Sequence, residues 1–159
     1  MTELFVNIGE LKVLRGKGKL IAIGLGSCVG VALIDAEEQV AGLAHVFLHT
    51  SNNRQSETQP GKFADTAIDA LLEAVLRQGA KRERLQAKIA GGACLFPSIS
   101  GATTCVGELN VQAVLKHLGK AGIVLAGKDV GGSLGRKMTV DVSDGSVFVQ
   151  TIGQEPRRM

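Results

Sequence analysis

One cysteine, Cys28, stands among glycines in the stretch IGLGSCVGV. A thiol can act as a nucleophile when a base within hydrogen-bond reach removes its proton. The histidine that lies inside an apolar stretch, VAGLAHVFL, is His45. If the chain reverses between Ala36 and Glu37, Cys28 lies directly opposite His45 in an antiparallel hairpin, with Cβ atoms about 5 Å apart. The spacing therefore predicts a cysteine nucleophile paired with a histidine that acts as its general base.

The glycines beside the cysteine suggest how such a pair would meet its substrate. Glycine leaves the main chain uncovered, so a substrate can approach closely and amide N–H groups can face a developing oxyanion. We expect the oxyanion donors to be main-chain amides of Ser27, Cys28 and Val29.

The cysteine has three other interpretations. A phosphate-binding glycine loop needs a helix after the glycines, and the residues after Cys28 have the pattern of a strand. A buried structural cysteine stays open, because free cysteine is among the most buried residue types. A redox-sensing thiol needs a resolving partner, and neither Cys94 nor Cys105 is near Cys28 in sequence. Because the three cysteines show no metal-ligand spacing, we expect no metal and no disulfide framework, with Cys94 and Cys105 as small buried residues.

The elements that must position the pair can be placed from their patterns. Three strands are expected to form one antiparallel unit around the cysteine, at Lys19–Ile23, Val29–Ile34 and Val40–Leu48. An amphipathic helix ending near Gly79 and a second helix at Asn110–Leu118 alternate with further strands. The remaining expected elements are a polar loop at 49–61, a strand broken by glycines at 87–96, a loop at 101–107, a strand at 122–127, a loop at 128–136, and a hairpin of 137–142 with 146–151 turning at Asp144-Gly145. This interleaving favours an α+β fold, with 1–153 as one domain and 154–159 as a frayed tail.

Composition narrows the function classes. The chain has 159 residues, 45% of them hydrophobic, with five Phe and no Trp or Tyr. The core must therefore be aliphatic, and a base-stacking nucleic-acid surface is not expected. No uninterrupted apolar run reaches the ~18 residues of a membrane span. We expect a cytoplasmic protein that binds no nucleic acid and does not insert into membranes.

Several motifs, taken in order, are similar to a known family. The GSC and AH pieces at this spacing are the most specific of them. The chain resembles the chemoreceptor glutamine deamidases of bacterial chemotaxis, called CheD. The resemblance covers nearly the whole chain and rests on GLGSCVGV at 24–31, GLAHVFL at 42–48, KFADTAIDALLE at 62–73, KIAGGACLF at 88–96, GELNVQAV at 107–114 and DVGGSLGRK at 129–137.

The resemblance implies hydrolysis of selected glutamine side chains in methyl-accepting chemoreceptors, giving glutamate and ammonia without a cofactor. It implies layered mixed β-sheets flanked by helices, similar to cysteine-hydrolase toxin domains. It also implies recruitment to receptor arrays and a CheC-type phosphatase as a partner. The family nucleophile matches Cys28 and the family base matches His45.

The chain departs from the family at one position. A threonine usually lies six residues before the cysteine, and here that position is Ala22. Alanine has no side-chain hydrogen-bonding group, so it cannot orient the histidine as the third member of a triad does. Three alternatives follow: another group orients His45, the enzyme is slow, or the protein is a catalytically weak module that binds receptors or a phosphatase. If the pair works as a dyad without a third residue, as a Cys–His ion pair, Ala22→Thr is expected to raise the rate about 2- to 10-fold, whereas an unchanged or lower rate would mean that another group already orients His45.

Overall fold

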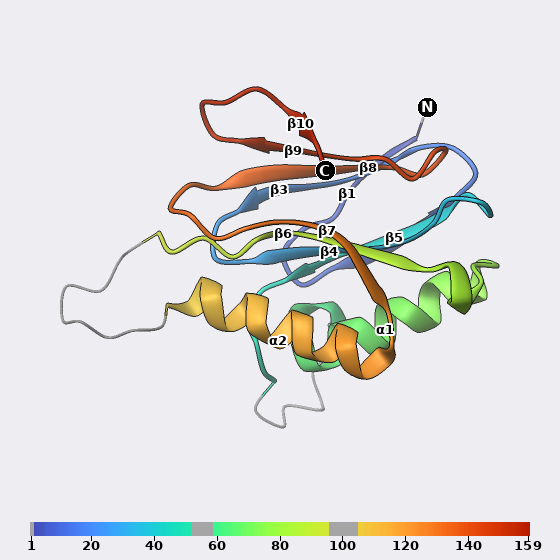
Figure 1. Ribbon diagram of the computed structural model, residues 1–159, viewed down its shortest axis with the longest axis horizontal. Helices are drawn as coiled ribbons and strands as arrows, with labels where there is room; N and C mark the ends of the chain where they lie inside the picture. The colour runs from blue at the N-terminus through green and yellow to red at the C-terminus, as the bar shows by residue number, and fades with distance from the viewer. Residues whose placement is uncertain (1, 52–58, 96–104) are drawn as a thin grey trace.

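The computed structural model describes residues 2–51, 59–95 and 105–159, and these residues form three layers (Figure 1). Two five-stranded sheets lie face to face, and helices cover the outer face of one of them. The elements in chain order are β1 Glu3–Phe5, β2 Leu11–Arg15, β3 Lys19–Leu25, β4 Val29–Asp35, β5 Val40–Val46, a 3-10 turn Pro60–Lys62, α1 Ala64–Arg77, a 3-10 turn Arg82–Arg84, β6 Gln86–Gly91, α2 Val106–Ala121, β7 Val124–Val130, β8 Arg136–Asp141, β9 Val147–Thr151 and β10 Arg157–Arg158.

Both sheets mix parallel and antiparallel strands. The outer sheet has the order β1-β3-β8-β9-β10, and the central sheet has the order β2-β5-β4-β6-β7. The pairs β1–β3 and β6–β7 are parallel, and the other pairs are antiparallel. The expected α+β class with layered mixed sheets is therefore confirmed.

The middle strands of the central sheet are buried on both faces, which explains their unbroken apolar runs. Every residue of β4 and β5 is buried. One face packs against α1 and α2 through residues such as Val31, Leu33 and Ile68. The other face packs against the outer sheet through residues such as Ala32, Leu43 and Met138. A strand in a middle layer loses the alternation of polar and apolar residues that a half-exposed strand shows.

The glycine-rich stretch crosses from one sheet to the other. The strand before it, β3, pairs with β1 and β8 in the outer sheet, whereas β4 pairs with β5 and β6 in the central sheet. The expectation that β3, β4 and β5 form one antiparallel unit is therefore wrong for β3 and right for β4 and β5. Cys28 is the last residue of the crossing, directly before β4.

The β4–β5 hairpin also differs from its predicted register. Gly30, not Cys28, lies opposite His45, because the strands pair from Asp35 and Val40 and the turn occupies the four residues between them. The buried Asp35 carboxylate accepts hydrogen bonds from the amide of Glu38 within this turn.

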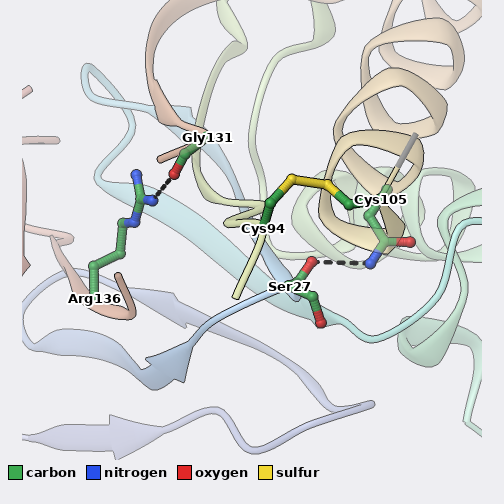
Figure 2. The surroundings of a disulfide bond; sticks show 6 residues. Ser27, Cys94, Cys105, Gly131 and Arg136 are labelled. Atoms are coloured by element: carbon green, nitrogen blue, oxygen red, sulfur yellow. Dashed lines mark hydrogen bonds between the residues drawn. A yellow bond between two sulfur atoms is a disulfide. The ribbon is translucent and has the colours of Figure 1, made fainter. Parts of the chain in front are cut away.

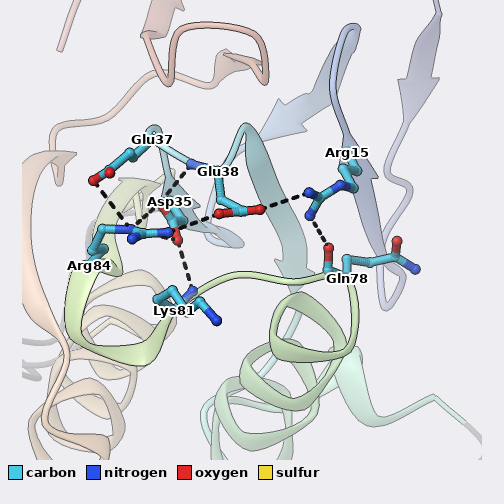
Figure 3. A network of polar contacts seen from close by, with 7 residues as sticks. All are labelled: Arg15, Asp35, Glu37, Glu38, Gln78, Lys81 and Arg84. Carbon is cyan, nitrogen blue, oxygen red and sulfur yellow. Dashed lines mark hydrogen bonds and ion pairs between the residues drawn. The ribbon is translucent and has the colours of Figure 1, made fainter.

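The same carboxylate holds the turn against the rest of the fold (Figure 3). It accepts the amide N–H of Lys81 at 2.8 Å and Nε of Arg84 at 3.1 Å. Burial opposes ionisation of Asp35, but the bonds from Arg84, Lys81 and Glu38 leave its pKa below the ordinary value. The register of the β4–β5 hairpin differs by two residues from the predicted one, and the turn that sets it is held by Lys81 and Arg84, which lie far away in the sequence.

Other element boundaries differ modestly from expectation. Helix α1 ends at Arg77, with Gly79 in a left-handed conformation after it, as predicted. Helix α2 begins at Val106, four residues earlier than predicted, so Val106 and Gly107 are helical rather than loop. The predicted loops at 49–61 and 101–107 lie partly outside the described residues. Strand β7 continues to Val130, into a stretch expected to be loop.

The end of the chain is ordered instead of frayed. Residues 157–158 form β10, which pairs with Val149 and Phe148 of β9, and the amide of Met159 donates to the Val147 carbonyl. Short-range patterns favour a frayed end, and only the exposed edge of β9 supplies a partner for this segment.

Candidate active site

The nucleophile candidate sits where the two sheets meet. Cys28 is 6% exposed and belongs to the apolar layer between the sheets. Its carbonyl accepts the amide N–H of Gly92, and the carbonyl of Gly26 accepts the amide of Ala93. Gly91 has φ +113°, and a Cβ there would overlap the Cys28 carbonyl oxygen. A glycine is required at Gly91 because two main chains touch at this point.

The base candidate lies on the same face of the central sheet. His45 follows Ala41 and Leu43 along the inward face of β5 and is 1% exposed. Since Gly30 is its direct cross-strand partner, Cys28 is a diagonal neighbour, and such side chains share a face at about 7–8 Å between Cα atoms. The structure thus places both residues in one layer, although the predicted direct pairing is wrong.

The two ring nitrogens of His45 differ in their hydrogen bonding. Its Nδ1 lies 2.9 Å from the carbonyl oxygen of Val6. A carbonyl only accepts, so Nδ1 carries the proton and Nε2 is the acceptor. Among the described residues Nε2 has no hydrogen-bond partner, although it is buried. This is the tautomer that a general base for a neighbouring thiol requires.

The main-chain carbonyl of Val6 orients His45, a role for which Ala22 offers no side-chain group. Its amide donates to the Ile21 carbonyl at 2.8 Å, which places Val6 alongside Ala22 in the outer sheet. Ala22 is fully buried in the same layer as Cys28. A main-chain carbonyl therefore orients His45 in this chain, one of the alternatives left open above. No residue pattern could have revealed it, because every residue carries a carbonyl.

Burial pushes both candidate groups towards their neutral forms. It lowers the pKa of His45, against the opposing effects of the Val6 carbonyl and the Glu10 charge. Burial likewise raises the pKa of the Cys28 thiol, and a hydrogen bond from its own amide opposes this rise. Burial therefore favours a neutral thiol and a neutral imidazole over a Cys–His ion pair.

The main-chain amides near the sulfur differ in availability. Within the described part of the chain, the Ser27 amide donates no hydrogen bond, and the Cys28 amide bonds only its own sulfur. Val29 is the first residue of β4 and is flanked by Val46 on one side and Gly91 on the other. A central-strand position leaves its amide within the sheet ladder.

The other two cysteines form a disulfide, which corrects the expectation of separate buried residues (Figure 2). Cys94 and Cys105 have Cα atoms 5.9 Å apart and are both half-buried. Cys105 is the residue before α2, and the amide of Cys94 donates to the Gly132 carbonyl. The sequence separation of 11 hides this pairing, because only the packing of α2 brings the two residues together.

A further polar residue was missed by sequence reasoning. Asn110 on α2 is fully buried, and its Nδ2 donates to the carbonyls of Ser27 at 2.9 Å and Phe47 at 3.0 Å. A signal existed: Asn110, Val114 and Leu118 follow each other at intervals of four, so a polar residue occupies the buried stripe of the helix.

Other features of the described residues do not extend this site. No three His, Cys, Asp or Glu side chains among them come together as a metal site needs. A hollow of about 420 Å³ opens beside Gly9 and Glu10, and neither Cys28 nor His45 lines it. None of the described helices is long and apolar enough to cross a membrane.

Known proteins resemble this chain over almost all of its length. The family model described as CheD chemotactic sensory transduction matches residues 47–151. A probable chemoreceptor glutamine deamidase CheD of Moorella thermoacetica is 44% identical over 154 residues, covering 96% of this chain and 92% of the relative. The protein of the same name from Clostridium novyi is 42% identical over 152 residues, covering 95% and 94%. The chemoreceptor glutamine deamidase CheD of Thermotoga maritima is 42% identical over 148 residues, covering 93% and 91%.

Proposed function

Because the chain belongs to the CheD family, we propose that it hydrolyses the side-chain amides of selected glutamines in chemoreceptors, releasing ammonia and leaving glutamate. The observation that carries the proposal is the state of His45. Its Nδ1 is fixed by the Val6 carbonyl, and its buried Nε2, on the face that holds Cys28, has no hydrogen-bond partner within the described part of the chain. A buried acceptor without a partner costs free energy, and a thiol proton would satisfy it.

The reaction follows from these groups. Nε2 of His45 takes the thiol proton as Sγ of Cys28 attacks the glutamine Cδ, and the carbonyl electrons move to oxygen. The tetrahedral intermediate collapses, the C–N bond breaks, and His45 returns the proton to the leaving ammonia. Water then attacks the thioester with help from His45, which releases glutamate and restores the thiol.

Two amides support the oxyanion part of the proposal. The N–H of Ser27 donates no hydrogen bond within the described fold, and the N–H of Cys28 bonds only its own sulfur, so both can donate to the oxyanion. The third expected donor, Val29, lies within the sheet ladder and contributes less directly.

The neutral resting state suits a buried site. A thiolate formed in advance would be poorly solvated between two sheets, as the raised pKa of Cys28 reflects. Proton transfer to His45 then occurs together with attack on the amide.

Partners and location belong to the same proposal. The substrate is a methyl-accepting chemoreceptor, and a CheC-type phosphatase regulates the enzyme at receptor arrays in the cytoplasm. A catalytically weak module that only binds these partners is the second candidate, and the absence of the family threonine at Ala22 favours it.

The deciding experiment is the intact mass of a purified receptor fragment after incubation with the protein. Each deamidation adds about 1 Da, because OH replaces NH₂. Cys28→Ala should abolish the mass gain and leave the thermal midpoint within a few degrees. The double variant Cys94→Ser/Cys105→Ser removes the other two cysteine sulfurs and should still deamidate, at a rate reduced only by loss of the disulfide that ties the start of α2. A mass gain with Cys28→Ala would exclude Cys28 as the nucleophile, and binding without any mass gain by the parent would favour the second candidate.

A further inference from the structure

Asn110 joins the two chain segments that carry the nucleophile and the base. One N–H of its amide holds the carbonyl of Ser27, the residue before Cys28. The other holds the carbonyl of Phe47, which follows the end of β5 and lies two residues beyond His45. Both segments end at this corner of the central sheet, and no other described side chain donates to either carbonyl.

Close packing at the start of α2 brings the Asn110 amide within hydrogen-bond distance of both carbonyls. Gly107 lies in the first turn of the helix, and a Cβ there would overlap the carbonyl of Ala93 and lie 2.6 Å from the carbonyl carbon of Gly92. A Cβ at Gly92 would in turn overlap the side chain of Val111. The disulfide ties Cys105, directly before the helix, to Cys94 (Figure 2). The start of α2 is therefore pressed against the main chain beside Cys28.

Holding the Ser27 carbonyl also fixes the Cys28 amide. The two belong to one planar peptide unit, in which the C=O and N–H bonds point in opposite directions. With the oxygen bound to Asn110, the N–H is directed away from α2, where it bonds the sulfur of its own residue. If this peptide rotated, the Cys28 N–H would point away from its own sulfur and could no longer donate to an oxyanion.

We propose that Asn110 is a positioning residue for the deamidation, which orients the Ser27–Cys28 peptide so that the Cys28 amide faces the reacting carbonyl. The inference rests on the proposed function for its role in catalysis. Its effect on the thiol rests on the hydrogen bond from Asn110 to the Ser27 carbonyl and on the bond from the Cys28 amide to its own sulfur, which opposes the rise that burial causes in the pKa of the thiol. The bond to the Phe47 carbonyl holds the end of β5, the strand that carries His45, at a fixed position relative to the same peptide.

The test removes the amide and measures both turnover and thiol reactivity. In Asn110→Ala, kcat should fall about 100-fold with KM within about threefold, because misplaced donors weaken transition-state binding more than substrate binding. Cys28 is the free cysteine of the described residues, so alkylation by iodoacetamide reports on it. Loss of the amide bond to the thiolate should shift the alkylation midpoint upward by roughly half a pH unit or more.

The matched control is Val114→Ala, one turn later on the same buried stripe of α2. It weakens the helix packing but retains both Asn110 bonds, so kcat and the alkylation midpoint should stay at parental values. If Asn110→Ala does not fold, Asn110→Leu keeps a similar side-chain volume without the two-donor amide and should show the same losses.

The possible outcomes separate the two proposals. A folded Asn110 variant with parental kcat and parental alkylation midpoint would overturn the positioning role, as would equal losses in Val114→Ala. If the parent deamidates no receptor but the alkylation midpoint still shifts in the Asn110 variant, the proposed function fails and the effect on the thiol stands.

Discussion

Replacing Ala22 with threonine tests which group orients His45. The family pattern alone predicts a faster enzyme, because the added hydroxyl would accept the Nδ1 proton. In the structure that proton already goes to the Val6 carbonyl at 2.9 Å. We therefore expect no gain in rate and a loss of stability.

The magnitude follows from the surroundings of Ala22. The residue is fully buried in the layer between the sheets, opposite Met138 of β8. Two extra heavy atoms in such a layer cost about 1–3 kcal/mol of unfolding free energy through overpacking. If the hydroxyl captured the Nδ1 proton, the Val6 carbonyl would lose its partner, and the exchange would give at most about a twofold change in rate.

The assay is single-turnover deamidation of a receptor fragment, read by intact mass, together with thermal unfolding. A loss of 1–3 kcal/mol lowers the midpoint by roughly 2–12 °C in a chain of this size. Ala22→Val is the matched control, because valine has the shape of threonine without the hydroxyl. Equal rates in the two variants would assign the effect to packing. A threonine variant more than tenfold faster than the valine variant, at an unchanged midpoint, would refute the role of Val6.

Two further predictions concern acid–base behaviour and the contact at the crossing. The deamidation rate should rise with pH and level off below the ordinary histidine pKa of about 6.5, because burial lowers the pKa of His45. The rate should fall only above the ordinary thiol pKa, because burial raises the pKa of Cys28. A midpoint above about 6.5 on the rising limb of the kcat/KM profile would contradict this. Gly91→Ala should lose activity and far more stability than Gly24→Ala in chemical denaturation, because both positions have positive φ but of the two only Gly91 faces the Cys28 carbonyl, whereas nothing lies within 4 Å of a Cβ at Gly24. Similar losses in the two variants would show that this contact is unimportant.

The residue types of the site were predictable, but their register was not. A cysteine among glycines and a histidine in an apolar strand are features of short stretches, and the structure places both residues in the layer between the sheets. The pairing of Gly30 with His45 depends on the turn after Asp35. That turn is held by Lys81 and Arg84, which no local pattern connects to the hairpin.

The supporting groups were invisible for other reasons. Val6 acts through a main-chain carbonyl, which carries no residue signature. The disulfide of Cys94 and Cys105 exists because glycines let α2 pack against the chain after β6, a contact that spacing rules for cysteines do not describe. Of these groups, Asn110 alone has a signal in the sequence, because it is a polar residue within the buried stripe of α2.

The crossing between the sheets has a consequence for the protein while it is being synthesised. A ribosome releases the chain from its N-terminus, so Cys28 and His45 emerge well before β6, α2 and β8. Until then β3 lacks its partner β8, β4 lacks β6, and the peptide before Cys28 lacks the amide of Asn110. The nascent chain thus carries the thiol and the imidazole without the frame that aligns them, and hydrolytic activity should begin only once α2 and the strands after it have docked.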